Sequence, residues 1–185
     1  MKKNNVYRLT TTAVLLALGT ALSFVKIYEL PLGGAVTLLS MLPICLISLF
    51  YGTAYAVLPC VLYGAIQMCV GGIFGWGLTP TVLVGGIVFD YLLAFGVLCL
   101  AGLFRNRGTA GAILGTVLAL VLRFVCHYVS GCIFFRSFDI YNNPYIYSLV
   151  YNGSYMLPEL VLTLIGAFIL YKSGAFARIC KLVKE

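Results

Sequence analysis

Apolar residues fill most of this chain in long stretches that are interrupted at only a few points by charges, prolines and glycines. The run from Leu30 to Phe104 contains Asp90 as its only charged residue. About 20 apolar residues are enough for a helix to cross the hydrocarbon layer of a membrane, so this run alone has room for three crossings. The pattern predicts a helical membrane protein with several crossings and very short loops.

Dividing the chain at these interruptions predicts six transmembrane helices. They cover Arg8–Val25, Ala35–Phe50, Ala54–Val70, Thr81–Phe104, Thr109–Phe135 and Tyr147–Tyr171. We expect each of them to cross a hydrocarbon layer of about 30 Å, at a rise of 1.5 Å per residue. We therefore expect an all-α membrane protein in which residues 1–185 form a single transmembrane domain.

Composition excludes several other classes of protein. The chain is 62% hydrophobic and only 9% charged, which is far too apolar for a soluble enzyme, a nucleic-acid-binding domain or a disordered chain. The net charge of +7 does not indicate a nucleic-acid partner, because the basic residues gather at chain ends and loops rather than along one face. The lipid bilayer is the expected surrounding. The seven cysteines form no C-x-x-C pair and are interpreted as apolar fillers rather than metal ligands.

The distribution of Lys and Arg predicts the orientation. Lys26 and Arg136 are the only basic residues expected on one side of the membrane. Nine are expected on the other side, namely Lys2, Lys3, Arg8, Arg105, Arg107, Lys172, Arg178, Lys181 and Lys184. Because cytoplasmic loops carry the excess of basic residues, both termini are predicted to be cytoplasmic.

Four ionisable side chains fall inside the predicted helices, where each needs a partner or a wet cavity. Asp90 and His127 lie about 12 to 14 Å below the outer surface by helix rise, so they share one level. Arg123 is four residues before His127, on the same stripe of its helix, with Gly131 four residues beyond. Glu159 ends a polar and aromatic stripe on the last helix that also contains Tyr147, Asn152 and Tyr155. Two interpretations stay open: these groups face one ligand cavity, or Asp90 or Glu159 only pairs with Arg123 to lock the bundle.

Aromatic residues gather in or beside the outer loops. They are Trp76, Phe134, Phe135, Phe138, Tyr141, Tyr145, Tyr147, Tyr151 and Tyr155. Many such residues simply line the membrane interface. Aromatic faces beside a buried carboxylate are also what a flat organic cation needs, since each ring contributes about 0.5 to 2 kcal/mol. The sequence therefore favours a small, cationic, aromatic ligand.

The chain has no G-x-x-x-x-G-K-[ST] motif, so it cannot bind ATP through a P-loop. No cofactor is expected, and uphill transport would need a partner. Ala13, Ala17 and Ala21 form a stripe of small residues on the first helix, which allows another membrane helix to approach closely. This stripe is the candidate partner-docking surface.

Four segments carry a resemblance to a known family. They are LPLGGAVTLLSMLP (residues 30–43), FDYLLAFGVLCLAGLF (89–104), RFVCHYVSGCIFF (123–135) and NPYIYSLVYNGSYMLPEL (143–160). Together they resemble the thiamine-specific substrate-binding (S) component of energy-coupling factor transporters, over nearly the whole chain. The last two segments are the most specific, because they combine His, Tyr and Asn at fixed spacing.

The resemblance implies a six-helix protein of the bacterial cell membrane that binds extracellular thiamine with high affinity. It implies delivery through a transmembrane T protein and two cytoplasmic ATPases, and it implies that the T protein contacts the A-x-x-x-A of Ala13 and Ala17. Asp90 would face the positive charge or the aminopyrimidine of the ligand. His127, Tyr147 and Asn152 match the hydrogen-bonding residues of the family, and Phe135 stands where some members have a stacking Trp.

The chain departs from some members of the family at two places. It has Asp90 where they have Glu, and it has no Trp near Gly33-Gly34. Trp76, the only tryptophan, is our candidate for the missing aromatic lid, with a place in the interface belt as the alternative. Two other functions remain open: an S component or carrier for another small cationic or aromatic vitamin or precursor, and a membrane enzyme using the ionisable groups as acids and bases.

Overall fold

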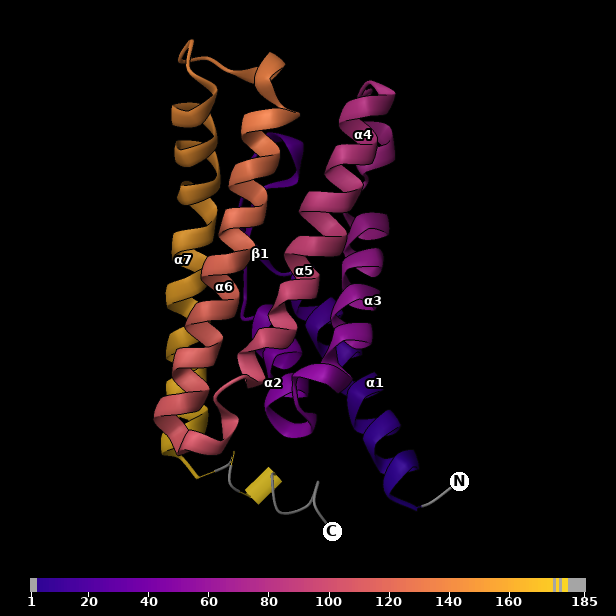
Figure 1. Cartoon of the computed structure of the whole chain (residues 1–185), viewed down its shortest axis with the longest axis vertical. Helices are drawn as coiled ribbons and strands as arrows, with labels where there is room; N and C mark the ends of the chain where they lie inside the picture. The colour runs from indigo at the N-terminus through magenta and orange to yellow at the C-terminus, as the bar shows by residue number, and fades with distance from the viewer. Residues whose placement is uncertain (1–2, 175, 177, 180–185) are drawn as a thin grey trace.

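Five long helices and one short helix build the part of the chain that the structure describes, residues 3–174, 176 and 178–179 of a computed structural model (Figure 1). The main elements are α1 (Lys3–Ser23), β1 (Lys26–Glu29), β2 (Ala35–Thr37), α2 (Met41–Tyr51), α3 (Thr53–Gly71), α4 (Pro80–Gly86), η3 (Ile87–Leu93), α5 (Ala94–Gly96), η4 (Val97–Gly102), α6 (Gly108–Ile133) and α7 (Pro144–Lys172). Short helical turns lie between them at η1 (Pro31–Gly33), η2 (Ile73–Gly75), η5 (Arg105–Arg107) and η6 (Arg136–Phe138).

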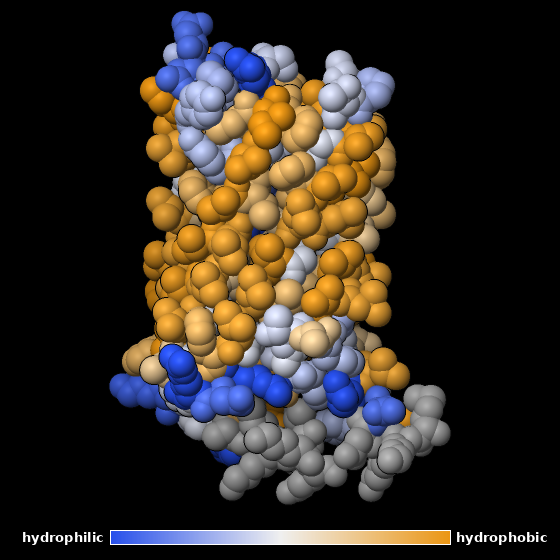
Figure 2. Space-filling model, viewed as in Figure 1, coloured by the Kyte–Doolittle hydropathy of each residue, from blue (hydrophilic) through white to orange (hydrophobic). Residues whose placement is uncertain are grey.

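The surface of the bundle matches a membrane protein. Figure 2 shows a broad apolar belt between two polar ends. Four stretches of helix in the described residues are long and apolar enough to cross a membrane, and one of them, Pro80–Ile133, is 54 residues long. That stretch reverses direction at η5, so it makes two crossings (Figure 1). The prediction of a helical membrane protein is confirmed.

The prediction of a second transmembrane helix over Ala35–Phe50 is wrong in its length. Ala35–Thr37 form a strand, and α2 has only 11 residues, about 16 Å at 1.5 Å per residue. All residues of α2 except Leu42 and Tyr51 are buried. The helix is apolar on all sides because other helices surround it, which gives the same sequence signal as a membrane crossing.

A two-stranded hairpin departs from the all-α prediction. β1 and β2 pair antiparallel, with Glu29 opposite Ala35 and an irregular register between Lys26 and Tyr28. The connecting turn has positive φ at Leu32 (62°) and at Gly33 (84°). The hairpin lies within the end of the bundle opposite to the chain termini (Figure 1).

The fourth long helix, from Pro80 to Gly102, is not a regular α-helix. It passes through the π-helical turn η3, which contains Asp90, and ends in the 3-10 helix η4. The hydroxyl of Ser48 on α2 explains η4, because it donates to the carbonyl of Cys99 and accepts from the N–H of Gly102 at 2.9 Å. A side chain inserted in this way replaces bonds of the regular helix. π-helical turns are frequent at functional sites, so the position of Asp90 in η3 supports its choice as a candidate site residue.

The start of α1 and the end of α7 lie at the same end of the bundle (Figure 1). Arg8 and Arg105 both lie at this end. Arg8 stacks on the ring of Tyr55 at 4.3 Å, and Arg105 donates to the carbonyl of Phe50 at 3.2 Å. Lys2, Lys181 and Lys184 lie outside the described residues. The cytoplasmic location of this end stays a prediction.

Gly115 provides a test of the packing between α6 and the fourth long helix. A Cβ at this position would overlap the backbone carbonyl of Ala101, whereas a Cβ at Gly153 on α7 would meet nothing within 4 Å. We expect Gly115→Ala to lower the free energy of unfolding by about 1–3 kcal/mol through overpacking. Gly153→Ala, the matched control, should raise it by about 0.5–1 kcal/mol. Thermal unfolding in detergent measures both, and equal effects would contradict the packing described.

Candidate functional site

One cavity opens among the hairpin, η3, α6 and α7. Its empty volume is about 1090 Å³, which includes open solvent at the mouth. All six residues predicted to bind the ligand line this cavity: Trp76, Asp90, His127, Phe135, Tyr147 and Asn152. The structure therefore brings together side chains that are up to 76 positions apart in the sequence (Trp76 to Asn152).

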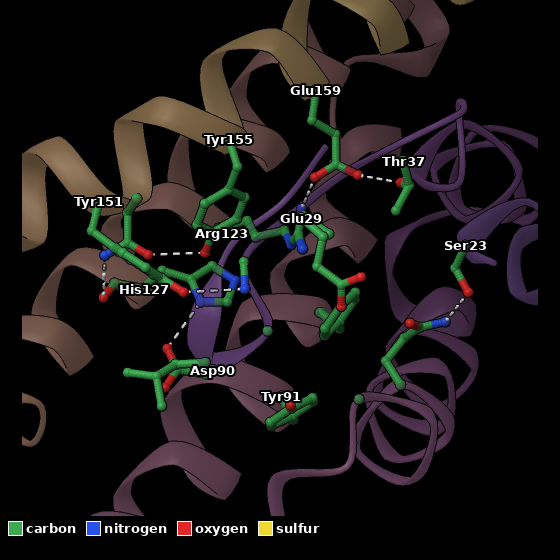
Figure 3. Close-up of a pocket in the computed structure, with 18 of the residues that line it drawn as sticks. Ser23, Glu29, Thr37, Asp90, Tyr91, Arg123, His127, Tyr151, Tyr155 and Glu159 are labelled. Atoms are coloured by element: carbon green, nitrogen blue, oxygen red, sulfur yellow. Dashed lines mark hydrogen bonds and ion pairs between the residues drawn. The ribbon is translucent and has the colours of Figure 1, made fainter. Parts of the chain in front are cut away.

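Asp90 is held by two donors on α6. The Nδ1 atom of His127 lies 2.9 Å from Oδ1 (Figure 3). The hydroxyl of Ser130 donates to Oδ2 at 2.6 Å. The spacing of these donors, three residues on one helix, places both on the face towards η3. Each carboxylate oxygen keeps a free lone pair, so Asp90 can still accept a bond or face a cation from the cavity.

His127 has its second ring nitrogen directed away from Asp90. The ring is buried, with 9% of the residue exposed, and its Nε2 atom has no hydrogen-bond partner among the described residues. An unpaired buried polar atom costs about 1–3 kcal/mol. Since His127 lines the cavity, a ligand with a matching polar group would remove this cost.

Asn152 is largely satisfied by the protein. Its amide nitrogen donates to the carbonyls of His127 and Ser148 at 3.3 and 3.0 Å, and its Oδ1 accepts from the hydroxyl of Tyr155 at 2.9 Å. The amide thus ties α7 to α6. Only the second lone pair of Oδ1 is left for a ligand, so Asn152 can accept a hydrogen bond from a ligand but has no hydrogen left to donate to one.

Aromatic side chains form the wall and the roof of the cavity. Tyr147 stacks on Tyr151 with ring centroids 5.8 Å apart, and Tyr151 contacts Tyr155 edge to face at 5.9 Å. The ring of Trp76 lies against the hairpin turn, since a Cβ built on Gly33 would be 2.6 Å from its Cη2 atom. Trp76 thus lies beside Gly33, while its role as an aromatic lid stays a prediction.

A buried ion pair lies deeper in the cavity. Nη1 of Arg123 is 2.9 Å from Oε2 of Glu159, and their side chains are only 7% and 3% exposed. Oε1 of Glu159 accepts from the hydroxyl of Thr37 on β2 at 2.6 Å (Figure 3). The expected pairing of Glu159 with Arg123 is thus present, and Asp90 instead pairs with His127. Both arrangements coexist with an open cavity.

Several lining residues were not predicted from the sequence. On the far side of the cavity Gln67 of α3 donates to Ser23 of α1 at 3.1 Å, and Glu29 enters from the hairpin. Gln67 could have been identified from the sequence, because it is a polar amide residue within an apolar helix. Ser130 adjoined the predicted stripe of α6, but its role depended on which way η3 turns Asp90.

No group of three or more His, Cys, Asp or Glu that could hold a metal ion occurs in the described part of the chain.

Three comparisons with known proteins agree with one another. The protein family described as thiamine transporter protein (Thia_YuaJ) matches residues 9–177. The curated thiamine transporter ThiT of Bacillus subtilis (strain 168) is 29% identical over an alignment of 188 residues that covers 94% of this chain and 94% of that protein. A solved structure of ThiT from Listeria monocytogenes is similar in fold, with a TM-score of 0.74, 22% sequence identity and coverage of 92% of this chain and 96% of that chain.

The ion pair at the cavity floor gives a prediction about stability. Glu159→Gln keeps an acceptor for Thr37 but leaves the Arg123 guanidinium without a counter-charge. We expect a loss of about 3–5 kcal/mol in the free energy of unfolding, because a buried charge remains unpaired. The double variant Arg123→Met/Glu159→Leu should recover most of this loss. Unfolding in detergent tests the pair, and a double variant less stable than Glu159→Gln would contradict the prediction.

Proposed function

This chain belongs to the thiamine transporter protein family, which its residues 9–177 match, and from that premise we propose that it is the high-affinity thiamine-binding S component of an energy-coupling factor transporter. Membership in this family makes the chain a transporter, so the interpretation as a membrane enzyme is dropped. In this role it captures extracellular thiamine without chemical change and hands it to partner subunits.

The observation that carries the proposal is the charge of the cavity. Its lining includes two basic residues, Lys26 and Arg123, and three acidic residues, Glu29, Asp90 and Glu159. Arg123 pairs with Glu159, and Lys26 pairs with Glu29. Counted over the Lys, Arg, Asp and Glu residues of the lining, Asp90 is therefore the excess negative charge. A single permanent cation such as the thiazolium of thiamine neutralises it.

The polar atoms around Asp90 suit the rest of the ligand. The aminopyrimidine offers both donors and ring-nitrogen acceptors, while Nε2 of His127 and the remaining lone pair of Asn152 are the unused groups of the site. Tyr147 and Phe135 offer ring faces beside them. We propose that Trp76 covers the occupied site, which its contact with Gly33 supports.

The proposed partners are a transmembrane T protein and two cytoplasmic ATPases, which use ATP in place of this chain. α1 is the proposed docking helix. Only 22% of its apolar window is buried inside the bundle, the lowest share among the four membrane-crossing stretches found in the described residues. Ala13, Ala17 and Ala21 are all exposed on it, so their small side chains leave room for another helix.

Isothermal titration of the purified protein with a panel of vitamins tests the proposed ligand. We expect thiamine to bind with a dissociation constant far below that of the other vitamins. Quenching of Trp76, the sole tryptophan, should report the same binding curve. Tight binding of another vitamin in place of thiamine would contradict the proposal.

A substitution at the carboxylate tests the charge argument. Asp90→Asn should raise the dissociation constant for thiamine by about 10- to 100-fold, because the excess negative charge is lost. A neutral thiophene analogue, in which carbon replaces the charged ring nitrogen, should lose much less affinity. Titration of both ligands against both proteins measures the difference. Equal losses for the two ligands would mean that Asp90 acts only as a structural residue.

Substitutions on the outward face of α1 separate capture from uptake. Ala13→Leu and Ala17→Leu should leave thiamine binding unchanged, since both residues are exposed and neither lines the cavity. Uptake by cells expressing the whole transporter should fall to background, because the larger side chains hold a partner helix away. Val14→Leu, on an exposed neighbouring position, is the control. Unimpaired uptake would remove this face from the proposed docking surface.

A further inference from the structure

Glu29 lines the cavity from the outer hairpin, opposite Asp90. Figure 3 shows its side chain extending into the space that the labelled residues surround. Its side chain is 54% exposed, compared with 3% for Glu159 and 17% for Asp90. Glu29 is therefore the acidic residue of the lining that is in contact with the solvent at the mouth.

The hairpin directs Lys26 and Glu29 into the same space. Residues three apart on a regular strand point to opposite faces. The register between Lys26 and Tyr28 is irregular, and such an irregularity turns the strand locally, so that both side chains line the cavity. Nζ of Lys26 donates to Oε1 of Glu29 at 2.6 Å.

Lys26 is the only cation of the lining that solvent can reach. The other one, Arg123, is buried and bound to Glu159. The two negative charges of a phosphate ester in this cavity need a cation or water beside them. Among the lining residues, only the ammonium of Lys26 is placed to be that cation. That ammonium is occupied by Glu29, whose own charge repels a phosphate.

We propose that Glu29 is a specificity-determining residue, which makes the site select free thiamine over thiamine phosphates by holding Lys26 in an ion pair. This inference rests on the proposed function and extends it. With Glu29 present, the cavity accepts one positive charge and offers no group to a phosphate. Without it, Lys26 becomes a phosphate-binding ammonium at the mouth.

The energetic argument depends on exposure. An ion pair at a partly exposed position contributes little to folding, so Glu29 can be replaced without loss of the bundle. A phosphate dianion brought beside the pair meets one attractive and one repulsive charge, which nearly cancel. Removal of the carboxylate leaves the attraction alone, and charge-assisted contacts to phosphate are strong ones.

The test compares thiamine with thiamine monophosphate by titration of the purified protein. Glu29→Gln should narrow the ratio of their dissociation constants by about tenfold, chiefly through tighter binding of the monophosphate. Asp139→Asn is the control, because it removes one negative charge from the outer loop after α6 without touching the cavity lining. Its ratio should equal that of the unmodified protein.

A double-mutant cycle shows whether Glu29 acts through Lys26. In Lys26→Met/Glu29→Gln the gain for the monophosphate should disappear, because no ammonium is left to bind it. An unchanged ratio in Glu29→Gln, or a gain that persists in the double variant, would overturn the inference. Failure of the unmodified protein to bind thiamine would instead overturn the proposed function, so the two outcomes are distinct.

Discussion

The site depends on keeping one carboxylate ionised inside an apolar bundle. A carboxylate without partners in such surroundings costs several kcal/mol, so Asp90 requires donors within reach. His127 and Ser130 provide one donor for each oxygen, and both belong to α6. The same contacts therefore stabilise the charge and join η3 to α6. Because the donors approach from one side, the other side of the carboxylate stays open to the cavity.

The other two ion pairs of the cavity differ in strength because they lie at different depths. Arg123 and Glu159 are almost fully buried, where the loss of one partner leaves an unpaired charge that water cannot reach. Lys26 and Glu29 lie at the mouth, where solvent competes for both groups. The inner pair is thus a fixed part of the fold, which also anchors the hairpin through Thr37. The outer pair can exchange partners, and so it is suited to selecting among ligands.

The sequence predicted the composition of the site better than its geometry. Asp90 and His127 were placed at one level by counting helix rise, and this succeeded because both lie in long helices near the same surface. The path of residues 35–40 could not be predicted, because a buried helix and a crossing helix have the same apolar pattern. The bond of Ser130 to Asp90 depends on the π-turn η3, and the position of Glu29 depends on the irregularity in the strand. The orientation of the Asn152 amide depends on the contact between α6 and α7. None of these three features has a local sequence signal.

A short connection joins α1, the proposed docking helix, to the hairpin at the mouth of the cavity. Only Phe24 and Val25 separate the last residue of α1, Ser23, from the first residue of β1, Lys26. Ser23 also accepts from Gln67 across the cavity wall, and Tyr63 donates to the carbonyl of Gly19 at 3.1 Å. These two bonds hold the end of α1 to α3. In the proposed function, the docking helix and the hairpin at the mouth of the cavity are thus consecutive parts of the chain.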